Sequence, residues 1–204
     1  MALQKLTLTI RKGSAENIPI RLEQSAWSYA TISAVSQTAP LRISALAHGI
    51  PDGWRVAIMN VKSVGDFAAQ NNPPKDAELR PVTVIDADIV EFNAINGAAF
   101  RAYVSGGQLA YREPLDLTPY NGARMDVKDK TGGTTMVSFE LGLGITLETL
   151  TPALLLEPTI EQSLGLAAKT YVFDIELLRT AGGVDPICSA ESTLTVLPEI
   201  TTTE

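Results

Sequence analysis

Cysteine and histidine are almost absent from this sequence, which has one residue of each in 204. The single cysteine, Cys188, excludes a framework of intrachain disulfides. With His48 as the sole histidine, we expect neither a zinc site built on histidines nor a nucleophile–histidine–acid triad. We interpret His48 as a polar turn residue before Gly49. Cys188 lies in a strand-like stretch and is interpreted as a small buried side chain, the alternative being a nucleophile.

Positive charge is scarce and scattered. Sixteen Lys and Arg residues face 23 Asp and Glu residues, the net charge is −7, and the longest basic cluster is Arg11-Lys12. Binding of nucleic acid through phosphate neutralisation is therefore not expected. Charged residues make up only 19% of the chain. Two interpretations stay open: partner proteins cover part of the surface, or the surface is rich in Thr, Ser and Gln, as in many all-β proteins.

Long apolar runs are also missing. No window approaches the roughly 20 apolar residues of a membrane-spanning helix. The first residues alternate Leu6, Leu8 and Ile10 with polar positions, whereas a signal peptide has a continuous apolar segment. We therefore expect no membrane partner and a protein made and assembled in a cytosol.

Short alternating segments dominate what remains. Residues 115–128 (LDLTPYNGARMDVK) read as a turn followed by a strand over 123–128, with Ala123, Met125 and Val127 on one face. The strongest strand pattern covers residues 170–179. Further strands are expected at residues 4–11, 18–22, 30–35, 41–45, 54–61, 80–86, 89–93, 100–104, 136–141, 145–147, 153–156 and 187–197.

Two local signals refine this pattern. Pro19 cannot donate to a strand ladder, so residues 18–22 are expected at a sheet edge or at a strand start. Thr159 and Gln162 have the spacing of a capping box, which predicts a short helix through Leu164. Short strands separated by Gly, Pro and Asn turns every 8–12 residues predict an all-β sandwich or barrel, without an internal repeat.

Two acidic clusters are candidates for chemical sites. Asp86, Asp88 and Glu91 could offer oxygens to Ca²⁺, but they lack the spacing of a calcium-binding loop and are better explained as a solvated turn between strands. Asp174 and Glu176 could act as paired carboxylates in acid–base catalysis. The polar face of the strand over 170–179 explains the same pattern, and we favour that interpretation.

Glycine pairs and aromatic residues give no sharper site. Three glycine pairs, at 106–107, 132–133 and 182–183, are expected in hairpin turns, because none is followed by the Lys-Ser/Thr of a phosphate loop. Five aromatic residues are candidates for a sugar-binding surface, although core or hinge packing is favoured: Trp27, Tyr29, Trp54, Tyr103 and Tyr111. We assign no catalytic, cofactor-binding or metal-ligating residue and expect no enzyme.

Two segments, 6–22 and 115–201, resemble the N-terminal β-sandwich domain of baseplate upper proteins of tailed phages. The resemblance is carried, in order, by residues 10–14 (IRKGS), 114–120 (PLDLTPY), 123–127 (ARMDV), 144–147 (GITL), 171–177 (YVFDIEL) and 195–201 (TVLPEIT). A short helix precedes the fifth motif in that family, as expected here.

The intervening segment, 31–108, resembles the small β-barrel modules of phage tail proteins that are similar to the first catalytic-cysteine half-domain of ubiquitin-activating enzymes. The matching residues are 47–50 (AHGI), 52–56 (DGWRV), 84–88 (VIDAD), 90–92 (VEF) and 103–107 (YVSGG). Residues 64–67 (VGDF) only echo the central element of that module. No ubiquitin chemistry is implied, because the module carries no catalytic residue.

Together the resemblances imply an all-β protein: a β-sandwich (jelly-roll or immunoglobulin-like) with an inserted small β-barrel. The expected domains are 1–30 with 111–204, and 31–110. The implied function is a structural adaptor of a tailed bacteriophage at the tail, neck or baseplate, present in many copies and bound to tail, connector, baseplate or fibre proteins. Alternatives are a receptor- or carbohydrate-binding module and a head decoration or collar protein. The expected location is the virion, assembled in the bacterial cytoplasm.

Overall fold

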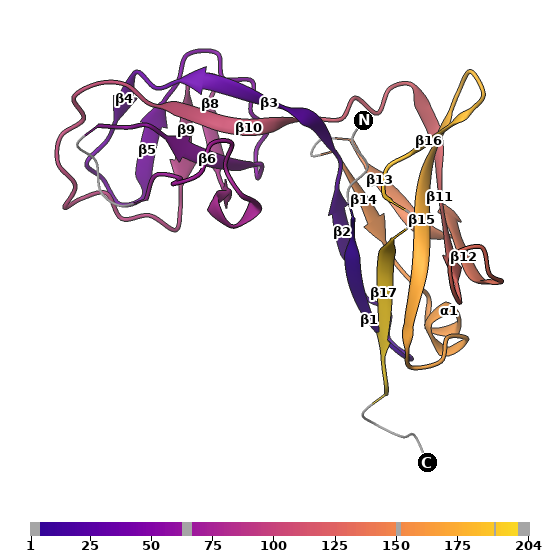
Figure 1. Cartoon of the computed structure of the whole chain (residues 1–204). Coiled ribbons are helices and arrows are strands. Elements are labelled where there is room, and N and C mark those ends of the chain that lie inside the picture. Colours follow the sequence, from indigo (N-terminus) through magenta and orange to yellow (C-terminus); the bar gives the residue numbers. More distant parts are fainter. Residues whose placement is uncertain (1–4, 63–66, 150–151, 190, 200–204) are drawn as a thin grey trace. The chain divides into compact units, whose positions relative to one another are not determined.

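The computed structural model describes residues 5–62, 67–149, 152–189 and 191–199, and nearly all of its regular structure is β-strand (Figure 1). The all-β prediction is confirmed. The chain divides into two compact units: unit 1 comprises Met1–Leu22 and Leu115–Glu204, and unit 2 comprises Glu23–Pro114. Unit 2 is therefore inserted into the sequence of unit 1.

Unit 1 is a single curled sheet. Its spatial order is β1-β17-β15-β11-β12-β13-β14-β2, with β16 paired to β15. The strands are β1 (Thr7–Arg11), β2 (Ile18–Arg21), β11 (Tyr120–Lys128), β12 (Thr135–Leu141), β13 (Gly144–Glu148), β14 (Ala153–Leu156), β15 (Thr170–Arg179), β16 (Val184–Pro186) and β17 (Ser192–Leu197). Side chains from strands throughout this order meet in one core, so the sheet closes around it.

The centre of this sheet is formed by the two strands with the clearest sequence pattern. β11 and β15 pair antiparallel, with Met125 opposite Ile175 and Val127 opposite Phe173. All four of these side chains are buried. Burying each large apolar side chain contributes roughly 1.5–3 kcal/mol, so the alternation seen in the sequence reports directly on the core.

The ends of the unit 1 sheet also follow sequence signals. β2, which contains Pro19, is the last strand in the order and pairs only with β14 among the described residues. The helix α1 (Ile160–Leu164) begins at a capping box in which the Thr159 hydroxyl accepts from the Gln162 N–H. Both features agree with the prediction from sequence.

Unit 2 consists of two four-stranded sheets around a shared core. One has the order β3-β10-β6-β7 and the other β4-β5-β9-β8. Their strands are β3 (Glu23–Thr31), β4 (Ala34–Val35), β5 (Leu41–Ser44), β6 (Arg55–Met59), β7 (Arg80–Pro81), β8 (Thr83–Asp86), β9 (Ile89–Phe92) and β10 (Gln108–Pro114), with a 3-10 turn η1 (Asp76–Glu78). The chain crosses between these sheets four times, from β3 to β4, β5 to β6, β7 to β8 and β9 to β10.

The two expected domain boundaries need correction. Boundaries at 30/31 and 110/111 fall inside β3 and β10, whereas the chain divides at 22/23 and 114/115. β3 and β10 pair along Gln108–Arg112 and Trp27–Thr31, so neither strand can be split between units. At the division, the Leu115 N–H donates to the Leu22 carbonyl oxygen at 2.9 Å, which places the two ends of the unit 1 segments side by side.

One expected strand is absent and another begins later than expected. Residues 100–104 are not a strand; Phe100 instead stacks on Phe67, with ring centroids 5.0 Å apart. The final strand covers Ser192–Leu197 and not 187–197. Ile187 and Cys188 are buried outside it, because the chain enters the core there before β17 begins.

Candidate functional site

His48, interpreted as a polar turn residue, is buried in unit 2. Its Nδ1 accepts a hydrogen bond from the Ile50 N–H at 3.0 Å. Its Nε2 therefore carries the proton and faces the Asp86 carbonyl oxygen at 3.2 Å. The Tyr111 hydroxyl donates to the His48 carbonyl oxygen at 2.6 Å. Both ring nitrogens are used to hold a turn, so the imidazole is not free for chemistry.

The acidic cluster at residues 86–91 is engaged in the same way. Asp86 Oδ1 accepts from the Asp88 N–H, and Asp88 Oδ1 accepts from the Ala47 N–H, both at 2.8 Å. Glu91 pairs with Arg42 at 2.7 Å across β9 and β5. The Asp86 and Asp88 carboxylates fix the β8–β9 turn and hold it against the turn that contains Ala47. No group of His, Cys, Asp and Glu suited to a metal ion occurs among the residues that the structure describes.

Asp174 and Glu176 lie on the outer face of β15, as expected. Glu176 is directly opposite Arg124 on β11, and its Oε2 lies 2.7 Å from the guanidinium. Asp174 lies 3.5 Å from Lys128 Nζ. Cross-strand ion pairs of this kind typically contribute about 0.2–1 kcal/mol. The two carboxylates form part of a charged ladder, and this arrangement does not set up an acid–base pair.

Cys188 is buried in the core of unit 1. Burial raises the pKa of its thiol, which disfavours the thiolate that nucleophilic chemistry requires. His48 belongs to the other unit. The interpretation as a small buried side chain agrees with this environment.

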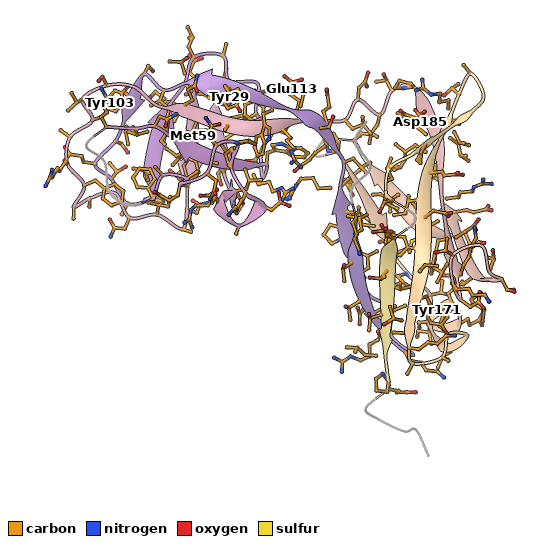
Figure 2. The ribbon with its side chains drawn as sticks, viewed as in Figure 1. Tyr29, Met59, Tyr103, Glu113, Tyr171 and Asp185 are labelled. Carbon is orange, nitrogen blue, oxygen red and sulfur yellow. The ribbon has the colours of Figure 1, made fainter. Side chains whose placement is uncertain are left out.

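The five aromatic residues do not gather on one surface. Trp54 is fully buried and its Nε1 donates to the Arg112 carbonyl oxygen at 2.7 Å. The Tyr103 hydroxyl lies 3.0 Å from the Ile32 and Gly106 carbonyl oxygens. Trp27 is half-buried beneath the Arg112 guanidinium, 4.9 Å from its ring centroid. Tyr29, labelled in Figure 2, is the exception, with 45% of its surface exposed.

The glycine pairs lie in turns or at the entry to a strand, and none begins a helix. Gly107 shows why a side chain is excluded at such a point. Its φ is +97°, and a Cβ there would lie 2.5 Å from Val61 Cγ2. The pair at 106–107 therefore serves close packing before β10 and does not form a phosphate loop.

A loop organised by Glu78 covers the outer face of one unit 2 sheet. Ala57, Met59 and Ala110 are buried on that face, and Ala69, Leu79 and Trp27 pack against them. The Glu78 carboxylate accepts from the backbone N–H groups of Gln70, Asn71 and Lys75 at 2.6–3.2 Å. These bonds, led by the one from Lys75, hold the pKa of Glu78 at about 2.

The pH dependence of this loop provides a test. Because the folded-state pKa of Glu78 lies below its ordinary value of 4.5, its contribution to stability is present above about pH 4.5 and is lost as the pH falls toward about 2. We expect the amide chemical shifts of Gln70, Asn71 and Lys75 to titrate together with a midpoint near pH 2. In Glu78→Gln this transition should be absent; its persistence there would assign it to another group.

One open depression, of about 460 Å³, lies on the outer face of β2, β13 and β14. It is lined by Pro19, Arg21, Glu148, Ala153 and Leu155. One cationic and one anionic side chain flank an apolar floor there. This composition lacks the histidine, cysteine or serine of a nucleophilic site.

The sequence did not reveal where apolar side chains remain exposed on unit 1. Leu141 and Leu143 lie at the β12–β13 corner, and Ile160 and Leu164 lie on α1; each has between 42% and 57% of its surface exposed. The Glu157 N–H bonds to the Gly144 carbonyl oxygen at 2.8 Å, so the corner and the segment leading to α1 are neighbours. We name these four residues the corner surface. Alternation could not single them out, because they lie at the end of a strand, in a turn and in a short helix.

No protein-family model matches the chain, and a search of curated proteins finds no relative. In the described residues no helix is long and apolar enough to cross a membrane. The contacts described above give His48, Asp88 and Glu176 structural roles.

Proposed function

We propose that this chain is a structural protein of a tailed phage virion, an adaptor that anchors fibres or spikes at the tail, neck or baseplate. The proposal starts from the resemblance of unit 1 to the N-terminal domain of baseplate upper proteins. Its partners would be other virion proteins, in a symmetric assembly of many copies.

One observation carries the proposal: the resembling motifs lie on or beside strands of unit 1 that share one core. Residues 10–14 end β1, 114–120 lead into β11, 144–147 lie in β13 and 171–177 in β15. Residues 195–197 lie in β17, while 200–201 fall outside the described residues. Short motifs rich in β-forming residues recur by chance; finding them in family order around a single core supports a shared fold.

The candidate polar side chains are held in hydrogen bonds and ion pairs within the fold. Together with the exposed corner surface, this favours an interaction protein. A carboxylate held by arginine or by backbone N–H groups is poorly placed to transfer protons. Exposed apolar side chains gathered in one region commonly mark protein–protein contacts, and the residues of the corner surface lie on neighbouring segments. The corner surface is therefore the part of unit 1 that we assign to virion contacts.

Purified particles from the producing bacterial culture test the proposal. We expect the chain to co-purify with density-banded virions at a fixed ratio to the major tail protein. Gold-labelled antibodies against unit 2 should mark the tail, neck or baseplate in electron micrographs. Label spread over the head would support a decoration protein instead, and absence of the chain from particles would refute the virion role.

The corner surface provides a matched pair of variants for the same assay. Leu143→Glu places a charge at the most exposed residue of the corner surface. We expect this variant to fold normally but to be depleted from particles. Val184→Glu, at the exposed first residue of β16, is the control and should be incorporated like the parent chain.

A further inference from the structure

Strand β3 has one edge that pairs with no other strand in the described part of the chain. Among the described residues β3 pairs only with β10, and it ends the sheet order β3-β10-β6-β7 (Figure 1). None of its nine residues is buried. An edge strand whose N–H and C=O groups are unpaired is a template for another strand.

The regular part of this edge is residues 27–31. They pair one-to-one with β10, from Trp27 opposite Arg112 to Thr31 opposite Gln108. Before Trp27 the register shifts: residues 24–26 of β3 lie opposite the single residue Glu113 of β10, so β3 carries two extra residues there. The regularly paired stretch is therefore Trp-Ser-Tyr-Ala-Thr.

Backbone alternation shows which groups face outward. The Ile32 N–H bonds to the Gly107 carbonyl oxygen at 3.1 Å, so the backbone N–H group of Ile32 points toward β10. In an antiparallel pair, residues alternate between facing the partner and facing away. Trp27, Tyr29 and Thr31 thus direct their N–H and C=O groups to the free edge. The Arg112 carbonyl agrees with this phase, because it bonds to Trp54 and not to Trp27.

The other strands that end a sheet carry the protections that proteins use against edge pairing. β1 contains Arg11, β2 contains Pro19, and β8 contains Asp86 and a register shift. β4 and β7 have two residues each. Charges, prolines, bulges and short length all discourage pairing. Residues 27–31 have no charge and no proline, and Trp, Tyr and Thr all favour strands.

We propose that this edge pairs antiparallel with the same edge of a second copy of the chain, about a two-fold axis at Tyr29. Tyr29 then lies opposite its own copy, and Trp27 lies opposite the partner's Thr31. All outward groups of residues 27, 29 and 31 find partners in this register. The inference does not depend on the proposed virion role.

Charge and the position of Tyr29 favour a second copy as the occupant. No charged residue of one edge meets a like charge of the other in this register. Unit 2 carries seven Lys and Arg residues against nine Asp and Glu, a net charge of −2, so repulsion between copies is small and screened at physiological salt. Tyr29 is 45% exposed in the single chain and would cover its copy across the axis. Aromatic pairs across strands stabilise sheets.

The interface is small, which fixes the expected strength. A pair of five-residue strands buries less than the roughly 1,200–2,000 Å² of a stable interface, so we expect a reversible dimer with a dissociation constant on the order of 100 µM. Such an interface acts mainly where other contacts already hold copies close together, as in a symmetric assembly.

Sedimentation velocity on the full chain from about 10 µM to about 1 mM tests the proposal. We expect concentration-dependent dimerisation of the parent chain. Tyr29→Lys and Tyr29→Glu should each be monomeric over this range, because each places like charges across the axis. An equimolar mixture of the two should dimerise again, since Lys then faces Glu. Tyr29→Thr, which keeps the N–H group and strand preference, is the control and should dimerise within about tenfold of the parent.

The charge-swap mixture makes the test specific for the axis. Rescue in the mixture supports pairing centred at Tyr29. A parent chain that stays monomeric up to about 1 mM, Lys and Glu variants that dimerise like the parent, or a mixture that stays monomeric would each overturn the proposal. Circular dichroism of both single variants checks that the exposed substitutions leave the fold unchanged.

Discussion

Deleting residues 23–114 and joining Leu22 to Leu115 through a two-residue Gly-containing turn is expected to leave unit 1 folded. The reason is local: the Leu115 N–H already bonds to the Leu22 carbonyl oxygen at 2.9 Å. This bond continues the β3–β10 pairing and holds the two ends close enough for a short linker to connect them. Unit 1 also keeps its whole core, which draws on no residue of unit 2. A cooperative thermal transition by far-ultraviolet circular dichroism and resistance to trypsin would show this.

The boundaries expected from sequence provide the control for this deletion. Removing residues 31–110 leaves most of β3 and the end of β10 attached to unit 1. Trp27 and Tyr111 would then lose the unit 2 side chains that cover them. We expect this variant to aggregate at concentrations where the first deletion stays soluble. An unfolded chain in both cases would show that unit 1 needs unit 2, and the division at 22/23 and 114/115 would not mark folding units.

Trp54→Ala is expected to destabilise unit 2 by about 3–5 kcal/mol, the usual cost of removing a large buried aromatic side chain. Trp54 is fully buried at the centre of the unit 2 core, and its Nε1 bonds to the Arg112 carbonyl oxygen. The substitution leaves both a cavity and an unpaired carbonyl. A loss of this size is a large part of the roughly 5–15 kcal/mol that stabilises a typical domain.

Tryptophan fluorescence isolates this effect, because Trp27 and Trp54 are the only tryptophans and both belong to unit 2. In Trp54→Ala, the unfolding transition reported by Trp27 fluorescence should have its midpoint at a lower denaturant concentration. Trp54→Phe keeps most of the buried ring and should cost less, about 1–3 kcal/mol, mainly for the unpaired Arg112 carbonyl. Equal losses in the two variants would mean that the hydrogen bond, and not the packing, dominates at this position.

The sequence predicted best where one face of a strand is buried. β11 and β15 alternate because their inner faces meet the core and their outer faces carry the Arg124–Glu176 ladder. The capping box of α1 and the edge position of Pro19 are equally local, since each depends on residues a few positions apart. Such features need no knowledge of the partner strand.

Two central features escaped because alternation is absent from them. β10 is buried on both faces at Leu109, Ala110 and Tyr111, with one face toward the shared core and the other toward the Glu78 loop. β3 has no buried residue at all. A strand buried on both sides and a strand buried on neither give no period of two. Missing this pair displaced both predicted boundaries.

The candidate residues show the same limit at the level of side chains. The interpretation of His48 as a polar turn residue said nothing of its environment, which the structure supplies: the ring is buried and bonded at both nitrogens. Its partners, Ile50 and Asp86, lie two and 38 positions away. Short-range partners follow from spacing, whereas long-range ones depend on how β8 and β9 return to that turn.

The bond between Leu22 and Leu115 has a kinetic consequence. A flexible loop delays the meeting of its ends, because their closure costs conformational entropy that grows with loop length. Unit 2 is contiguous in sequence, and its first and last residues, Glu23 and Pro114, are themselves partners in the β3–β10 pair. Once unit 2 has folded, it presents its two ends at strand spacing and acts as a short turn for unit 1. We therefore expect unit 2 to fold first and to speed the closure of the sheet that surrounds it in sequence.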